Sequence, residues 1–477
     1  MNGFLAQLNH WIPIIADDYL WGWGPSFLGG IPLMVILLLG TGILLTLKTK
    51  AIQVRRFMNA TRLVLAGAFK KDKELNKEEG DITPFQALMT ALSATVGNGN
   101  IAGVATAIAM GGPGAAFWMW ITAVFGMATK YSEAVLGVKH RKVMKDGSMA
   151  GGPMYYCEYG IGGKAGRVLA IAFAIFGTIA CLIGTGNMFQ TNSIAVAAKA
   201  QFGIPQWISG VIVTVLVGLV IIGGIKRIGQ VAEKLVPTMI ALYFLGAMGI
   251  IFWKITEIPH AFAIIFESAF SPMAALGGAV GIGVQQSIRF GVARGILSNE
   301  SGLGSAPIAH GAAKTKDPVQ QGQVAMMGVF IDTIVVCSLT ALVITVTGAY
   351  LRGPLFIKDG TALNSIDMTS WAFNSAFPSG GIVVAVGSFL FGVSTLLGWS
   401  YYGEKCLEYL IGIKIRTFYR ILFIIFMFIG SLPSAKGIQV VVKVGDIGNA
   451  MMAIPNLVAL IFLAGSVAKT TKKFLGR

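Results

Sequence analysis

Residues 82–129 form an unbroken stretch of 48 residues without a single Asp, Glu, Lys or Arg. A membrane-spanning helix needs about 20 mostly apolar residues, so this stretch is long enough for two spans. The segment 111–114 (GGPG) is the natural turn between them, because Gly and Pro interrupt helices. Only 12% of the chain is charged and 55% is hydrophobic, whereas a soluble protein is about 25% charged. This composition excludes a soluble enzyme or binding module and predicts an all-α integral membrane protein.

Further charge-free runs locate the remaining spans. Together with the pair in 82–129 they predict 11 transmembrane helices, the others lying in 31–47, 168–198, 200–225, 235–253, 268–288, 318–351 (interrupted by Asp332), 368–403, 421–435 and 447–468.

The basic residues predict the orientation of these spans. With the N-terminus outside, the loops on the inner side hold 30 Lys and Arg and those on the outer side hold six. Cytoplasmic loops carry such an excess, so the net charge of +16 reflects topology and not nucleic-acid binding. We expect a cytoplasmic C-terminus and a location in the cell membrane, the inner membrane in a bacterium. Residues 51–69 are either an amphipathic helix at the inner surface or an ordinary loop helix.

Two of the predicted spans contain glycine and polar residues at mid-depth. They are residues 94–103 (ATVGNGNIAG) and residues 277–291 (GGAVGIGVQQSIRFG). Discontinuous helices in corresponding halves are typical of a transporter's binding site. If 1–81 supply an extra N-terminal helix and a linker, the halves 82–254 and 255–477 form a five-plus-five inverted repeat. The alternative is that these glycines only allow close helix packing.

A broken helix exposes N–H groups that suit a carboxylate and C=O groups that suit a cation. Gly97 and Gly99 allow a ligand to approach the main chain, and Asn98 and Asn100 add polar side chains. This chemistry fits a small zwitterion together with a monovalent cation.

Other polar residues in the spans have two interpretations each. Asn187 and Gln190 lie in a segment too polar to face lipid, which either lines the cavity or makes interhelical hydrogen bonds. The hydroxyls of Ser394 and Thr395 lie in mid-span and either serve a ligand or bond back to their own helix.

Charged residues inside a membrane are costly and are functional candidates. Asp332 is a candidate cation ligand or proton relay, or a structural partner of Arg289 or of a hydroxyl. Arg289 is a candidate partner of a substrate carboxylate, and Glu300 a candidate cap or gate. Asp332, Glu300 and Arg289 are also the candidates for coupling transport to the driving ion. We expect no enzyme activity and no cofactor besides the coupling ion, because no catalytic or metal-ligating cluster occurs in the spans.

Four motifs resemble those of the alanine or glycine:cation symporter family (sodium:alanine symporters) in the amino acid–polyamine–organocation superfamily. They are GNGNIAG (97–103), GGPGAAFWMW (111–120), SNESGLGSAP (298–307) and GWSYYGEK (398–405), and the resemblance runs from about residue 30 to 468. It implies a sodium- or proton-coupled importer of small neutral amino acids, with a fold like that of the neurotransmitter:sodium symporters.

The resemblance also implies site residues. Main-chain N–H groups at Asn98 and Gly99 would hold the substrate carboxylate. Carbonyls of Ser93 and Val96 with hydroxyls of Ser394 and Thr395 would bind sodium, and Asn100 matches a second sodium ligand in some relatives. The pocket lining would include Gln286, Ser287 and Phe290. Asn98 departs from the threonine usual in the family, which leaves room for a substrate other than alanine or glycine.

The first interpretation is therefore sodium-driven import of alanine or glycine across a lipid bilayer. The alternatives are proton- or sodium-coupled transport of glutamine or another neutral amino acid, or, from a different class, an ion channel.

Overall fold

The computed structural model of the chain describes residue 15 and residues 32–69, 78–271, 284–357, 361–432 and 435–476. Within these residues the fold is helical, apart from one antiparallel hairpin of β1 (Lys142–Val143) with β2 (Met149–Ala150) and one isolated bridge. The predicted all-α class is confirmed.

The helices, including short 3-10 and π segments labelled η, are α2 (Leu33–Lys48), α3 (Ile52–Arg55), α4 (Phe57–Phe69), α5 (Pro84–Thr95), η4 (Gly99–Gly103), α6 (Val104–Gly111), α7 (Ala115–Lys139), α8 (Pro153–Tyr155), η5 (Tyr156–Ile161), α9 (Gly163–Ile183), α10 (Met188–Phe202), α11 (Gln206–Ile221), α12 (Gly224–Trp253), η6 (Ile255–Glu257), α13 (Ile258–Phe270), α14 (Val284–Asn299), α15 (Ala306–Gly311), α16 (Pro318–Val329), η8 (Phe330–Cys337), α17 (Ser338–Val346), η9 (Ala349–Arg352), α18 (Ser365–Ala376), α19 (Gly381–Ile411), η10 (Ile413–Ile415), α20 (Arg416–Ser431) and α21 (Ala435–Leu475).

Several helices suit a membrane. Among the described residues, five stretches are long and apolar enough to cross one, namely Gly163–Lys199, Gly224–Trp253, Pro318–Val346, Gly381–Ile411 and Val440–Leu475. Three shorter apolar helices, Leu33–Lys48, Gly99–Gly111 and Gln206–Ile221, lie over further predicted spans. The chain is therefore a helical membrane protein, and the total of eleven spans stays a prediction.

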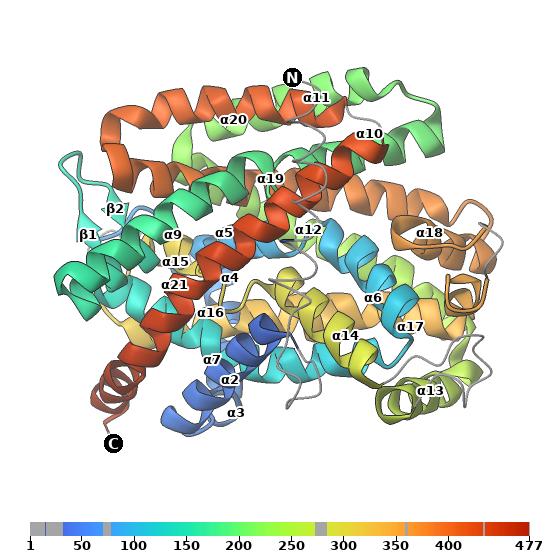
Figure 1. Cartoon of the computed structure of the whole chain (residues 1–477), viewed down its shortest axis with the longest axis horizontal. Coiled ribbons are helices and arrows are strands. Elements are labelled where there is room, and N and C mark those ends of the chain that lie inside the picture. Colours follow the sequence, from blue (N-terminus) through green and yellow to red (C-terminus); the bar gives the residue numbers. More distant parts are fainter. Residues whose placement is uncertain are drawn as a thin grey trace.

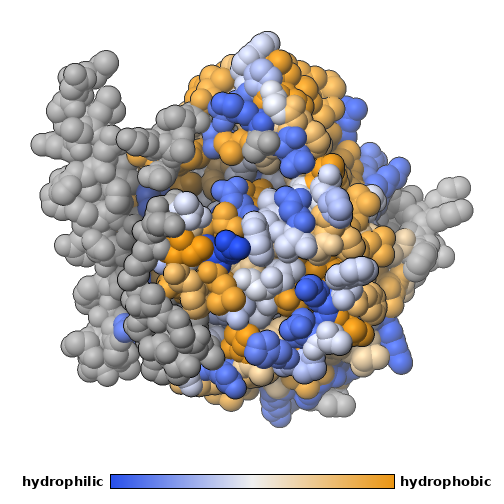
Figure 2. Space-filling model, turned by 90° about the vertical axis from the view of Figure 1, so that its right-hand side faces the viewer, coloured by the Kyte–Doolittle hydropathy of each residue, from blue (hydrophilic) through white to orange (hydrophobic). Residues whose placement is uncertain are grey.

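The helices lie side by side, with the hairpin at the left of the molecule and α18 at the right (Figure 1). Figure 2 looks onto the α18 side, where hydrophilic residues run along the middle of the face between hydrophobic ones. This distribution of hydrophilic and hydrophobic residues is expected for a face that is exposed to water at its centre and surrounded by lipid at its edges.

The first predicted break is present in the structure. The capping box of Thr83 and Gln86 starts α5, with Pro84 at the first helical position. The helix stops at Thr95, and η4 resumes at Gly99. Of the second break, residues 272–283 lie outside the described residues, so its glycines 277–283 are not described.

A further interruption was missed by the sequence analysis. The uncharged run 168–198 suggested a single helix, but α9 ends at Ile183 and α10 starts at Met188. The glycines between them allow close contacts, since a Cβ on Gly184 would lie 2.5 Å from Gly445 Cα. A Cβ on Gly186 would lie 2.5 Å from the ring of Trp399. Tertiary packing of α19 and α21 therefore decides this break.

Candidate binding site at the helix break

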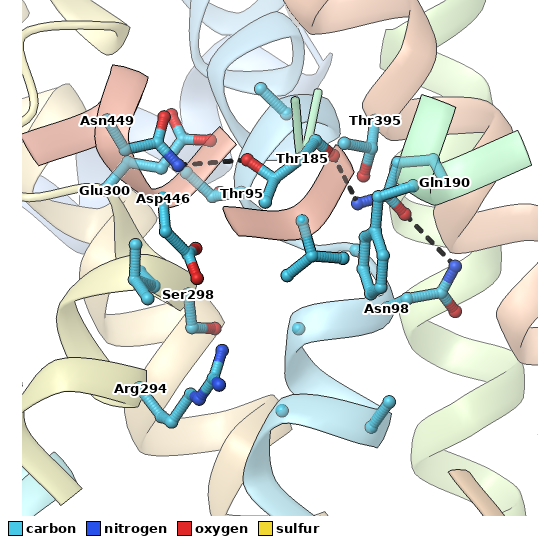
Figure 3. A pocket seen from close by; sticks show the side chains of 18 of the residues that line it. Thr95, Asn98, Thr185, Gln190, Arg294, Ser298, Glu300, Thr395, Asp446 and Asn449 are labelled. Carbon is cyan, nitrogen blue, oxygen red and sulfur yellow. Dashed lines mark hydrogen bonds between the residues drawn. The ribbon is translucent and has the colours of Figure 1, made fainter. Parts of the chain in front are cut away.

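A cavity of about 180 Å³ lies beside the first break (Figure 3). Its walls come from the broken helix and from α10, α14, α18, α19 and α21. The lining residues include Thr95, Gly97, Asn98, Gly99, Thr185, Gln190, Arg294, Ser298, Glu300, Ser365, Thr395, Trp399, Asp446 and Asn449. A cavity of this size with charged, amide and hydroxyl side chains in its wall suits a small polar solute.

The main chain at the break faces this cavity. Gly99, where η4 begins, is part of the wall, and the first N–H groups of a helix have no partner within it. A Cβ added to Gly99 would meet only Ser298 Cα, at 3.9 Å. A ligand can therefore approach the helix start at the positive end of its dipole.

Asn98 is held in place by its neighbours. Its amide nitrogen donates to Gln190 Oε1 at 3.1 Å, and its Oδ1 accepts from Ser388 Oγ at 2.7 Å. Gln190 in turn donates to the carbonyl of Thr185 at 3.0 Å, as the dashed lines in Figure 3 show. Two amides thus form a fixed polar wall, which sequence reasoning anticipated for Asn98 and Gln190.

Asn187 has a structural role instead. It does not line the cavity, is fully buried and donates to the carbonyl of Phe423 at 3.0 Å. For this residue the alternative of interhelical hydrogen bonding applies.

Asn100 connects the break to Asp332. Its Oδ1 accepts from the Gly97 N–H at 2.9 Å, and its amide nitrogen donates to Asp332 Oδ1 at 2.7 Å. The Asp332 carboxylate also accepts hydrogen bonds from Ser298 Oγ at 3.1 Å and Thr333 Oγ1 at 2.7 Å. Asp332 is fully buried and does not line the cavity, whereas its partner Ser298 does. Hydroxyl partners were one of the two structural alternatives for Asp332.

The four residues implied as sodium ligands lie in the region where α5 packs on α19. Ser394 Oγ lies 3.4 Å from the carbonyl oxygen of Val96, and a Cβ on Gly398 would lie 2.9 Å from Ser93 Oγ. All four are buried. Both hydroxyls of Ser394 and Thr395 also donate back to the carbonyl of Phe391, at 2.9 Å each. The structure therefore shows the bonds back to their own helix, and the role of these hydroxyls as ligands stays a prediction.

Helix α14, which follows the second predicted break, contributes other residues than expected. Gln286, Ser287 and Phe290 do not line the cavity but pack against Gly111, whose carbonyl accepts from Ser287 Oγ at 2.5 Å. Arg294, Leu297 and Ser298 of α14 line it instead. The residues expected from the sequence precede these lining residues by one to three helical turns. The reason is that the crossing of α14 with α6 decides which part of α14 reaches the break.

The expected charged residues divide between wall and surroundings. Glu300 lines the cavity and accepts a hydrogen bond from Ser305 Oγ. The guanidinium of Arg289 lies 5.6 Å from the ring centre of Phe290, and Arg289 is not among the lining residues.

Two charged wall residues were missed by sequence reasoning, Arg294 on α14 and Asp446 on α21. Both side chains point into the cavity from the side of Ser298 (Figure 3). Helical spacing was the available signal: Arg294 and Ser298 are four residues apart, and Asp446 and Asn449 are three apart, so each pair shares a face.

Apolar membrane helices around a polar cavity at a helix break define a membrane transport protein. The family model described as the sodium:alanine symporter family matches residues 19–477. This chain belongs to that family.

Its relatives cover nearly the whole chain. The sodium/alanine symporter AgcS of Methanococcus maripaludis is 48% identical over 460 residues, 96% of each chain. GlnT of Bacillus subtilis, a probable sodium/glutamine symporter, is 36% identical over 470 residues, 98% of this chain and 91% of its own. The crystal structure of MhsT with L-phenylalanine aligns with 83% of this chain and 99% of its own, at a TM-score of 0.49 and 14% identity.

Proposed function

We propose that the chain is a secondary active symporter that imports a small neutral amino acid, alanine or glycine, driven by a sodium gradient through alternating access. The main support is the cavity at the break of α5, where main-chain groups, hydroxyls and amides surround a space of about 180 Å³. The similarity to AgcS supports the same solute and ion.

The substrate carboxylate would bind at the start of η4. N–H groups at Asn98 and Gly99 suit an anion there, and Gly99 leaves space for it. The cavity lining also carries one basic side chain, Arg294, and two acidic ones, Glu300 and Asp446. A zwitterion has a group of opposite charge for each of these two kinds of side chain.

Sodium would bind between α5 and α19. Carbonyls of Ser93 and Val96 with the hydroxyls of Ser394 and Thr395 offer only oxygen, the ligand type that a hard monovalent cation prefers. The neighbouring cluster of Asn100, Ser298 and Asp332 provides a buried carboxylate for a second cation or a proton.

Glutamine is the second candidate substrate. The amides of Asn98, Gln190 and Asn449 in the wall can pair with a substrate amide, and a probable sodium/glutamine symporter is among the relatives. Coupling to protons through Asp332 or Glu300 is the corresponding alternative for the driving ion.

We place the N-terminus outside and the C-terminus in the cytoplasm of a cell membrane, following the 30-to-6 distribution of basic residues. Residues 82–254 and 255–477 would form the two inverted repeats, and 1–81 the additional helix and linker. In this orientation α18, which contributes Ser365 to the cavity wall, lies outside.

Uptake into proteoliposomes tests the function. We expect labelled alanine to accumulate above its external concentration under an inward sodium gradient, and not when potassium replaces sodium. Accumulation under a proton gradient alone would assign coupling to Asp332 or Glu300, and uptake of glutamine but not alanine would favour the second substrate. Equilibration without accumulation, with single-channel currents, would contradict symport and indicate a channel.

A further inference from the structure

A second cavity lies far from the helix break, between the end of α2 and the end of α21. Its volume is about 390 Å³, and five of its lining residues are basic: Lys48, Lys50, Arg55, Lys469 and Lys472. No Asp or Glu is among the described residues that line it. We propose that this basic cavity binds the phosphate headgroup of an anionic phospholipid from the adjoining leaflet.

The conformation of the turn after α2 places its basic side chains at the cavity. Lys50 and Ala51 have φ of 56° and 51°, a left-handed conformation that non-glycine residues adopt at a cost. The Arg55 guanidinium holds this turn, since Nε donates to the Lys50 carbonyl at 2.6 Å and Nη2 to the Thr49 carbonyl at 3.1 Å. The chain therefore maintains a strained turn that brings Lys48, Lys50 and Arg55 to one cavity.

The opposite wall is also held in place. Thr471 on α21 shares a hydrogen bond of 2.8 Å with the buried hydroxyl of Tyr131 on α7. This contact orients the last turns of α21, so that Lys469 and Lys472 face the α2 side. Five cations around one space repel each other, and an anion that enters the space relieves this repulsion.

The helices that form the cavity also offer a surface for acyl chains. Leu47, next to Lys48, is 71% exposed, and Phe462 on α21 is 74% exposed. Phe462 precedes Lys469 by seven residues, about 10 Å along the helix. The cavity therefore lies at the boundary between the apolar, lipid-facing part of these helices and their basic ends. This boundary is the level of the lipid headgroups. In Figure 1 the α2–α3 turn and the C-terminal end of α21 lie together at the lower left.

These observations favour an anionic lipid over a zwitterionic one. Phosphatidylglycerol carries a phosphodiester without a compensating cation, whereas the choline of phosphatidylcholine would add a sixth positive charge. Basic pockets between helices on the cytoplasmic side are a known form of anionic lipid recognition.

Native mass spectrometry of the full chain in detergent tests the proposal. The protein is titrated with phosphatidylglycerol, with phosphatidylcholine and, in a separate arm, with phosphatidylglycerol in the presence of inorganic phosphate. Wild-type protein should bind one phosphatidylglycerol more tightly than phosphatidylcholine. Each basic side chain near a membrane surface contributes about fivefold in affinity, so K469Q/K472Q should weaken this binding by about 30-fold.

K226Q/K414Q is the matched control, because it removes the same charge from exposed residues that do not line the cavity. If the first variant fails to fold, K48Q/K50Q tests the opposite wall. Equal losses in the control and cavity variants, or equal affinity for both lipids, would overturn the proposal. Displacement of the lipid by equimolar inorganic phosphate would identify a free-anion site and overturn the lipid assignment.

Discussion

The amide nitrogen of Asn100 donates a hydrogen bond of 2.7 Å to the carboxylate of Asp332, 232 positions further along the chain. The same Asn100 accepts from the N–H of Gly97 at the helix break. A single side chain therefore contacts both the main chain of the proposed substrate site and the buried acid of η8. We therefore expect a change of charge or position at Asp332 to reach the break through Asn100.

Asp332→Asn should abolish concentrative uptake while the protein still folds. The new amide can keep its oxygen toward the Asn100 amide nitrogen and turn its NH2 toward the hydroxyls of Ser298 and Thr333, but it removes the negative charge that a cation or proton needs. Uptake into proteoliposomes under an inward sodium gradient measures the effect, with Asp367→Asn in α18 as the control. Wild-type accumulation by Asp332→Asn would exclude a coupling role for this residue.

Gly99→Val should eliminate substrate binding and leave folding intact. The added side chain would project into the cavity, where its Cβ has no neighbour closer than Ser298 Cα at 3.9 Å. Binding of labelled alanine to purified protein measures this, and melting temperature reports on the fold. Gly40→Ala, on α2 with nothing within 4 Å of the new Cβ, is the neutral control. Unaltered affinity in Gly99→Val would rule out the break as the substrate site.

Thr395→Ala should raise the sodium concentration for half-maximal uptake by about tenfold, the effect of losing one oxygen ligand worth about 1.4 kcal/mol. Gly97→Ala should act similarly, since its Cβ would lie 2.4 Å from Thr395 Oγ1 and displace it. Ser400→Ala is the matched control, because this buried hydroxyl on the same helix donates to the Leu397 carbonyl and does not line the cavity. An unchanged sodium dependence in Thr395→Ala would place the ion elsewhere.

Acid should weaken a contact at the hairpin between β1 and β2. Burial disfavours the Asp146 carboxylate, but hydrogen bonds from Ser148 and the Arg416 guanidinium outweigh burial and lower its pKa to about 2. A lowered pKa in the folded state stabilises the protein above the ordinary pKa of about 3.9, and this stability disappears as the pH falls toward 2.

Asp146→Asn should therefore lower the melting temperature slightly at neutral pH, because the Asp146 side chain is 38% exposed and a solvent-accessible pair contributes at most about 1 kcal/mol. The difference from wild type should shrink between pH 4 and pH 2, within the window set by the two pKa values of about 3.9 and about 2. A difference that stayed constant with pH would mean that the carboxylate charge is not what stabilises the hairpin. Glu257→Gln, in a short helix elsewhere, serves as the control.

The break at Gly97 and the isolated acid Asp332 were predictable from the sequence. Their signals are local, since two glycines and two asparagines in an apolar span, or one acid in an apolar helix, stand out from their neighbours. The helical class and the Asn98–Gln190 side of the cavity were anticipated on the same basis.

The other side of the cavity depends on contacts between distant helices. Arg294 lines it while Gln286 does not, although both lie on α14 in a polar stretch. Helical periodicity limits which residues share a face, but the depth and rotation of α14 are set by its packing on α6 and α7. Likewise, Asn100 meets Asp332 only because η4 and η8 lie side by side. Hydropathy and glycine patterns act within about 20 residues of chain and therefore determine the helices and the break. Side-chain packing between helices, which has no local signature, determines which polar groups meet in the site.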